Sequence, residues 1–205
     1  MIYFLAIKGS SLMKGSFPVE IAWVDQDGNG ATYLIKPADE WLNPADGAMQ
    51  WCPKSEANHS ITLTTLLEMG VSHVDVARKA SAILGRLTVT VAADPELLVL
   101  RWFDMLFKAA GFRRSVAVIT VDQLYAWACR PLRDTLPLAD GPRRRFAELR
   151  IQSVGDAFIE RAKDTEMQRP GFEQRALHDA QSLWRTWRII RQEVAGHVKQ
   201  SGPHD

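Results

Sequence analysis

Cysteine is scarce in this sequence, and its scarcity excludes two classes of protein. Only Cys52 and Cys129 occur among 205 residues, and they form neither a CxxC motif nor a metal-ligand cluster. Disulfide-framework proteins and zinc ribbons need more cysteines at closer spacing. We therefore expect two reduced thiols and a cytoplasmic location.

Charge of one sign is not in excess either. The 25 lysines and arginines balance 24 aspartates and glutamates, for a formal net charge of +1. This balance excludes a histone-like polycation, although a basic groove can still form locally.

Long apolar runs are also missing. The first seven residues are apolar, but Lys8 and Gly9 end the run. A signal peptide needs positive charge first and a longer apolar core, and a spanning helix needs about 20 apolar residues. We expect a soluble protein with no membrane partner, in which residues 2–7 form a short buried strand.

What the sequence does contain is an alternation of strand and turn signals. Runs of β-branched and aromatic residues predict five strands. They cover Ile2–Ile7, Val19–Val24, Ala31–Ile35, Thr88–Ala92 and Ser115–Thr120. The turn-rich residues 25–30 predict a hairpin between the second and third strands, and prolines between 37 and 53 predict a long irregular surface stretch.

Helical periodicity predicts helices over 71–85, 94–110, 121–129, 143–163 and 173–194. Asp94 is expected to cap the second of these, with Pro95 in its first turn and Gly111 at its end. Together these elements predict an α/β class: a single domain over 1–196 with a five-stranded mixed sheet flanked by helices, the element order of the ribonuclease H-like fold. Residues 197–205 are expected to be a frayed tail.

Several segments occur in an order and spacing that resemble one nuclease family. They are Phe4–Leu12, Phe17–Ala22, Ser55–Ile61, Val76–Ala77, Trp102–Phe107 and Arg175–Ala180. The resemblance is to the DEDDh 3′–5′ exonucleases, the ribonuclease T-like and proofreading group, and it runs over nearly the whole chain. It implies four carboxylates that hold two divalent cations on the scissile phosphate, and a histidine that acts as general base.

The motif positions depart from that pattern. Ala6 and Lys8 stand where the family has its Asp-x-Glu, Val99 stands at the second aspartate, and Gln174 stands at the histidine. Only Asp179 remains. Magnesium prefers oxygen ligands, and a lysine ammonium would repel it. The sequence therefore predicts a catalytically inactive exonuclease-like protein with no cofactor and no catalytic residues.

Two alternatives stay open. An active metal-dependent exonuclease, using magnesium or manganese, would need a rebuilt site from Asp94, Asp104, Asp179 and His178, or one completed by a partner chain. An engineered knockout is the other, although the replacements exceed what inactivation requires.

An inactive protein could still bind single-stranded nucleic acid or a protein partner in the substrate groove that the resemblance implies, and it could be a homodimer. The candidate nucleic-acid-binding residues are Lys8, Ser10, His59, Asp179, Arg185 and Arg188. Lys8 and Asp179 either face each other as a simple ion pair or leave the ammonium to hold a phosphate. His59 matches a family histidine near the substrate, whereas His178 is more typical of a half-exposed helix residue.

Arginines are the main basic feature. They gather at 143–145 with Arg150, and Arg185, Arg188 and Arg191 form a stripe at helical spacing. Trp184 and Trp187 between them either offer stacking surfaces for unpaired bases or pack the helix against the sheet. The other tryptophans, namely Trp23, Trp41, Trp51, Trp102 and Trp127, are expected to pack in the core or against loops.

Overall fold

The computed structural model describes residues 1–45, 47–136, 141–171 and 173–201. Their contacts group the chain into two compact units. Unit 1 comprises Met1–Thr120 and Phe172–Gln181, and unit 2 comprises Val121–Gly171 and Ser182–Asp205. Every helix in the described ranges is too short or too polar to span a lipid bilayer.

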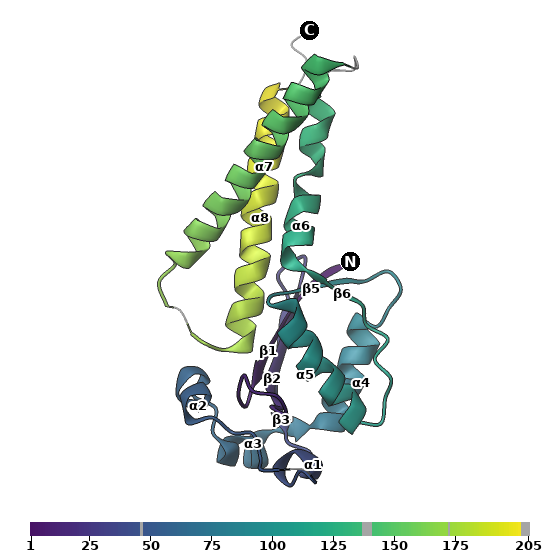
Figure 1. Ribbon diagram of the computed structural model, residues 1–205, viewed down its shortest axis with the longest axis vertical. Coiled ribbons are helices and arrows are strands. Elements are labelled where there is room, and N and C mark those ends of the chain that lie inside the picture. The colour runs from purple at the N-terminus through teal and green to yellow at the C-terminus, as the bar shows by residue number, and fades with distance from the viewer. Residues whose placement is uncertain (46, 137–140, 172, 202–205) are drawn as a thin grey trace. The chain divides into compact units, whose positions relative to one another are not determined.

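Unit 1 is built on a six-stranded mixed sheet in the order β4-β3-β2-β1-β5-β6. Figure 1 labels β1, β2, β3, β5 and β6 of this sheet. The strands are β1 (Ile2–Gly9), β2 (Pro18–Asp25), β3 (Gly30–Lys36), β4 (Val71–Ser72), β5 (Thr90–Ala93) and β6 (Val118–Thr120). β2 pairs antiparallel with β1 and β3, while β5 pairs parallel with β1 and β6, and β4 pairs parallel with β3. The α/β class and the mixed sheet flanked by helices are confirmed. The expected count of five strands is wrong, because β4 has only two residues and shows no periodicity.

The helices of unit 1 follow the sequence pattern less closely. They are α1 (Asp39–Leu42), α2 (Pro53–His59), α3 (Leu63–Met69), α4 (His73–Leu84) and α5 (Glu96–Ala109). The stretch expected to be irregular and superficial thus contains α1 and ends at the first residue of α2, and it buries Trp41. Asp94 does not cap α5: Pro95 occupies the cap position with no side-chain cap bond.

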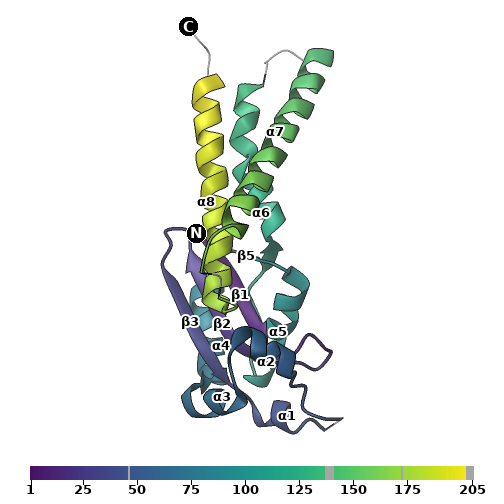
Figure 2. The ribbon, with the colours of Figure 1, turned by 90° about the vertical axis from the view of Figure 1, so that its left-hand side faces the viewer.

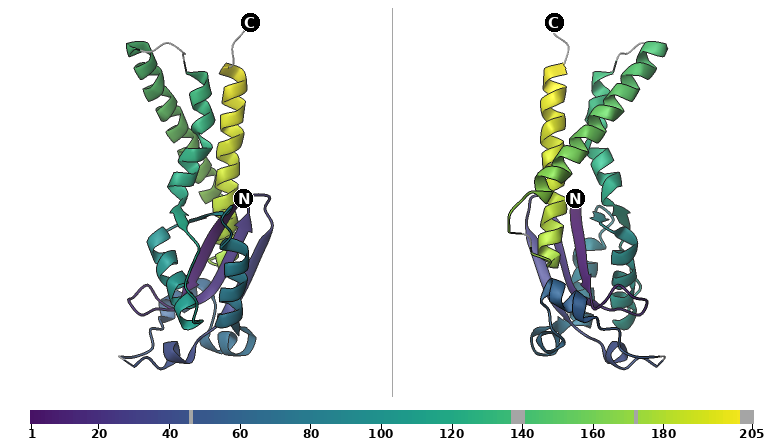
Figure 3. Two further views of the ribbon diagram at one scale, coloured as in Figure 1. Left: turned by 90° about the vertical axis from the view of Figure 1, so that its right-hand side faces the viewer. Right: turned by 60° about the vertical axis from the view of Figure 1, so that its left-hand side comes forward.

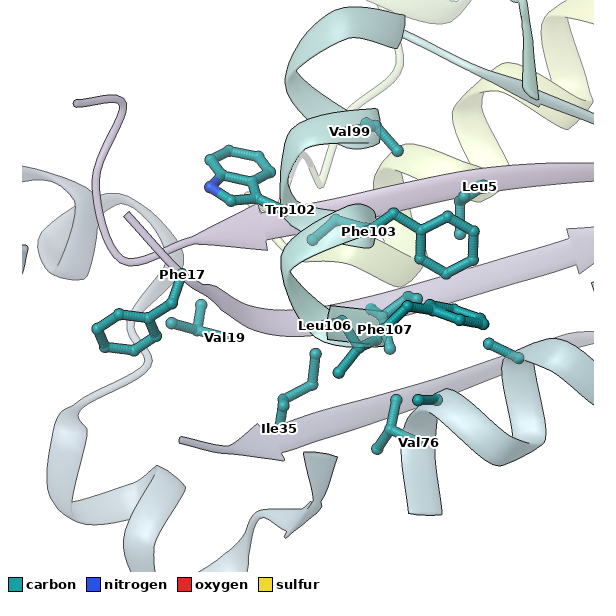
Figure 4. Packing of buried hydrophobic residues seen from close by; sticks show 14 of the residues in the cluster. Leu5, Phe17, Val19, Ile35, Val76, Val99, Trp102, Phe103, Leu106 and Phe107 are labelled. Carbon is teal, nitrogen blue, oxygen red and sulfur yellow. The ribbon is translucent and has the colours of Figure 1, made fainter. Parts of the chain in front are cut away.

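One face of the sheet packs on α4 and α5 and forms the hydrophobic core (Figure 3). Because side chains alternate along a strand, β1 sends Leu5 and Ile7 to this core and Ala6 and Lys8 to the other face. Figure 4 shows Phe103, Leu106 and Phe107 of α5 among these buried side chains. The opposite face is therefore where the motif positions of β1 lie.

Unit 2 is helical, and three of its elements are α6 (Val121–Ala128), the 3-10 helix η1 (Arg130–Thr135) and α7 (Pro142–Met167) (Figure 2). The long helix α8 (Ala176–Ser201) begins in unit 1 and continues in unit 2. It starts three residues later than expected and continues through 197–201, where a frayed tail was expected. Residues 202–205 of that tail lie outside the described residues.

Candidate functional site

An ion pair between β1 and the first turn of α8 stands at the centre of the site. Lys8 Nζ lies 2.6 Å from Asp179 Oδ2, and the two side chains are 18% and 33% exposed. Burial raises the pKa of the Asp179 carboxyl, although the hydrogen bond and charge of Lys8 oppose the rise. The facing arrangement considered from the sequence is therefore present.

A second, more buried ion pair lies beside the first, and the sequence pattern did not predict it. Glu20 sits opposite Lys8 in the β1–β2 register and is only 1% exposed. Arg175 Nε donates to both of its carboxylate oxygens at 3.0 and 3.1 Å, and the backbone N–H of Ala176 donates to Oε2 at 2.8 Å. One carboxylate thus binds the segment before α8 and its first residue.

A charged residue inside the apolar run Val19–Val24 was the signal that could have revealed this pair. Buried carboxylates are found with partners, so Glu20 required a cation from elsewhere in the chain. The sequence does not show which cation, because Arg175 lies 155 residues away.

His59 ends α2 and is buried, with 4% of its surface exposed. Its Nδ1 accepts the backbone N–H of Ile61 at 3.1 Å, and its Nε2 is buried. Burial and then the positive charge of Lys8 lower the pKa of His59, against the opposing charge of Glu20. The imidazole is therefore held neutral close to the two ion pairs.

Ser60, which follows His59, ends α2 in an uncommon backbone conformation. It has φ of 56°, in the left-handed region that glycine favours, and its N–H closes the helix on Glu56.

Ser10 has a structural role. Its hydroxyl donates to the carbonyl of Gln50 at 2.6 Å and accepts the N–H of Phe17 at 3.0 Å. Gly9 before it lies under the Trp102 ring, whose Nε1 donates to Ser16 at 2.9 Å. These contacts fix the loop that follows Lys8.

None of the other motif positions has a carboxylate or a histidine that could bind a metal ion here. Ala6 is buried opposite Ala22, Val99 is 2% exposed, and Gln174 is exposed. The alternative ligands are not brought together: Asp94 is exposed, and Asp104 pairs with Arg114. Across the described residues, no three His, Cys, Asp or Glu side chains form a group able to hold a metal ion. The residues present therefore do not fit the magnesium pair that the resemblance implies.

The arginine stripe of α8 lies in unit 2, where two of its members cover tryptophans. Arg188 stands over the Trp184 ring at 4.8 Å, and Arg191 stands over Trp187 at 4.7 Å. Trp187 is only 5% exposed, so it packs rather than offers a stacking surface.

Arg185, the remaining member, holds a buried carboxylate. Its Nε donates to Glu166 at 2.7 Å, and Arg169 donates to the same carboxylate at 2.9 Å. Burial raises the pKa of Glu166, but the two arginines outweigh it and keep that pKa below its ordinary value. Arg185 is therefore bound to Glu166 within unit 2, whereas Arg188 and Arg191 are exposed.

Comparison with known proteins identifies the fold. No family model and no curated protein matches the chain. Among solved structures, E. coli exonuclease I bound to a dT13 oligonucleotide superposes with a TM-score of 0.61 at 11% identity, covering 97% of this chain and 42% of that one. The same enzyme with a dA16 oligonucleotide gives 0.59 at 11% identity, covering 97% and 43%. An ExoI/SSB-Ct complex gives 0.59 at 11%, covering 97% and 42%.

The chain has an exonuclease fold. It spans less than half the length of these neighbours, and at such identities the likeness concerns the fold alone. The ribonuclease H-like architecture expected from the sequence is confirmed, and the loss of catalytic groups stays a prediction.

Proposed function

We propose that this chain is a catalytically inactive protein of the exonuclease fold that binds single-stranded nucleic acid without a divalent metal. The observation that carries the proposal is the Lys8–Asp179 ion pair, which sits where the resemblance puts metal-binding carboxylates. An ammonium 2.6 Å from the one remaining acid supplies a fixed positive charge.

The charges of the site support the proposal. Lys8 and Arg175 contribute two positive charges, and Glu20 and Asp179 contribute two negative charges, so the four groups compensate one another. A metal pair requires an excess of carboxylate oxygens, which this arrangement does not provide.

The binding residues follow from the same geometry. A backbone phosphate would contact the Lys8 ammonium, whereas buried His59 would act indirectly, as a neutral group beside that charge. Asp179 positions the ammonium, and Ser10 acts indirectly through the loop it fixes. Arg188 is a second, exposed candidate for phosphate contact. The neighbours that hold dT13 and dA16 make single strands the first ligand to test.

The test is a titration of a fluorescent single-stranded oligonucleotide with manganese or with a chelator, read for both binding and cleavage. We expect equal affinity under both conditions and an oligonucleotide of unchanged length. Lys8→Asp should weaken binding about tenfold and make it less salt-dependent, because one phosphate contact is lost. Arg78→Ala, which removes an exposed pair with Asp75, is the matched control.

Two outcomes would overturn the proposal. Shortened product that appears only with manganese would establish the metal-dependent alternative, in which Asp94, Asp104, Asp179 and His178 rearrange around the ion. Absence of binding by the unaltered protein would redirect the function to a protein partner.

A further inference from the structure

Unit 2 contains a hollow that belongs to neither ion pair described above. Its volume is about 870 Å³, and its walls come from α6, η1 and α7. Leu132 and Gly155 lie at its buried base. A second hollow of about 500 Å³ shares Arg145 and Leu149 with the first, so the two form one surface.

Aromatic rings are exposed along this surface. Trp127, which was expected to be packed, is 40% exposed, and the Arg130 guanidinium stands over its ring at 5.0 Å. Phe146 in the second hollow is 74% exposed. Exposed rings beside arginines are the groups on which unpaired bases stack.

The surface also carries an excess of positive charge. Four arginines line the first hollow, at positions 130, 133, 144 and 145, against the acids Glu148 and Asp156. Arg144 donates to Glu148 at 3.3 Å, whereas Arg133 and Arg145 are exposed and make no ion pair within the described ranges. The first turn of α7 contains no acid that would offset its arginines.

We propose that this surface is a second binding site for single-stranded nucleic acid. Bases stack on Trp127 and Phe146, and phosphates contact Arg133 and Arg145. The inference rests on the proposed function, since it assigns to unit 2 a site for the same class of ligand. An acidic protein would meet the same positive charge, but the flat exposed rings beside guanidinium groups match bases better than carboxylate side chains.

The variants separate stacking from charge, and oligo(dT) of about 20 nucleotides is the probe. Trp127→Ala should weaken binding on the order of tenfold with an unchanged salt dependence, because stacking releases no counterion. Trp127→Phe should restore most of the affinity, since it keeps a ring. Arg133→Gln should instead reduce the slope of log K against log salt by about 0.7, the value for one phosphate on a single strand. Arg78→Gln is the control.

The outcomes distinguish this inference from the proposed function. Binding that is unchanged in Trp127→Ala and Arg133→Gln but weakened in Lys8→Asp would overturn the second site and leave the first. No binding by the unaltered protein would overturn both. Displacement of the oligonucleotide by poly-glutamate as efficiently as by an unlabelled oligonucleotide of equal charge would assign the surface to an acidic protein and overturn the inference.

Discussion

Lys8 opposes the rise that desolvation causes in the pKa of Asp179. Lys8→Met removes that opposition, so the pKa of Asp179 rises further. A folded-state pKa above the unfolded value means that stability is lost as pH rises from the unfolded pKa through the folded one. We expect the variant to lose about 1–2 kcal/mol of unfolding free energy near pH 7.5 and less near pH 4.5, measured by urea unfolding.

The control for this prediction is Arg78→Met, which removes the partner of Asp75 in an exposed pair. It should change the unfolding free energy by less than about 0.5 kcal/mol at either pH. An equal loss in Lys8→Met at both pH values would show that the Asp179 charge does not cause the effect.

Position 9 requires glycine because of a side-chain contact and not because of its backbone conformation. A Cβ at this position would overlap the Trp102 ring, which is buried and held by its bond to Ser16. We expect Gly9→Ala to destabilise the protein by about 1–3 kcal/mol. Gly196 is the reverse case, because it lies within α8 and a Cβ there would meet no other atom. Gly196→Ala should therefore stabilise the protein by about 0.5–1 kcal/mol. Thermal unfolding of both variants measures the contrast, and a tolerated Gly9→Ala would contradict the packing.

The site residues divide by whether their partners can be inferred from the sequence. The resemblance placed Lys8 and Asp179 at motif positions, and their pairing followed as one of two alternatives. A charged residue in an apolar strand indicated that Glu20 needs a partner. The sequence did not indicate that the partner is Arg175, because two residues 155 positions apart form no local pattern. Helical spacing predicted that Arg185 is an exposed member of the arginine stripe. Such spacing carries no information about Glu166, which lies on another helix and binds Arg185.

At the scale of elements, Glu20 ties β2 to the start of α8. We expect Glu20→Gln to cost about 2–3 kcal/mol, because Arg175 loses its charge partner while the Ala176 N–H keeps one acceptor. Amides in the first turn of α8 should then exchange with solvent faster than in the unaltered protein, while exchange near the middle of α8 should not change. Hydrogen exchange with urea unfolding measures both effects.

Glu148→Gln breaks only the exposed pair with Arg144 and serves as the control. It should leave the exchange of α8 unchanged. Exchange that is unaltered in Glu20→Gln as well would mean that this carboxylate does not hold the first turn.

The predictability of elements depends on their length and on what surrounds them. β1, β2 and β3 were found because their apolar runs end in clear turn residues, and the same holds for α6. β4 was missed because two residues paired to β3 have no period of their own. The prolines that suggested an irregular stretch instead include Pro53, which stands in the first turn of α2, where its missing N–H costs nothing.

At the scale of the whole molecule, the chain returns to unit 1 through residues 172–181 after forming most of unit 2. A chain ending at Gln181 keeps the partners of Glu20 and Lys8, and a chain ending at Gly171 loses both. We expect the shorter chain to be less stable than the longer one by about 3 kcal/mol, from two broken pairs and lost apolar contact. Urea unfolding compares the two chains, and equal stability would show that the returning segment contributes nothing to unit 1.

The mutual compensation of Lys8, Asp179, Glu20 and Arg175 also limits which substitutions this part of unit 1 can accept. A single Lys8→Glu substitution would set a third carboxylate beside Glu20 and Asp179, whose charges already interact, with Arg175 alone to offset them. Like charges held close together repel, so this variant should be less stable than the unaltered protein. One of these charges can therefore be exchanged at little cost only together with the charge that it faces.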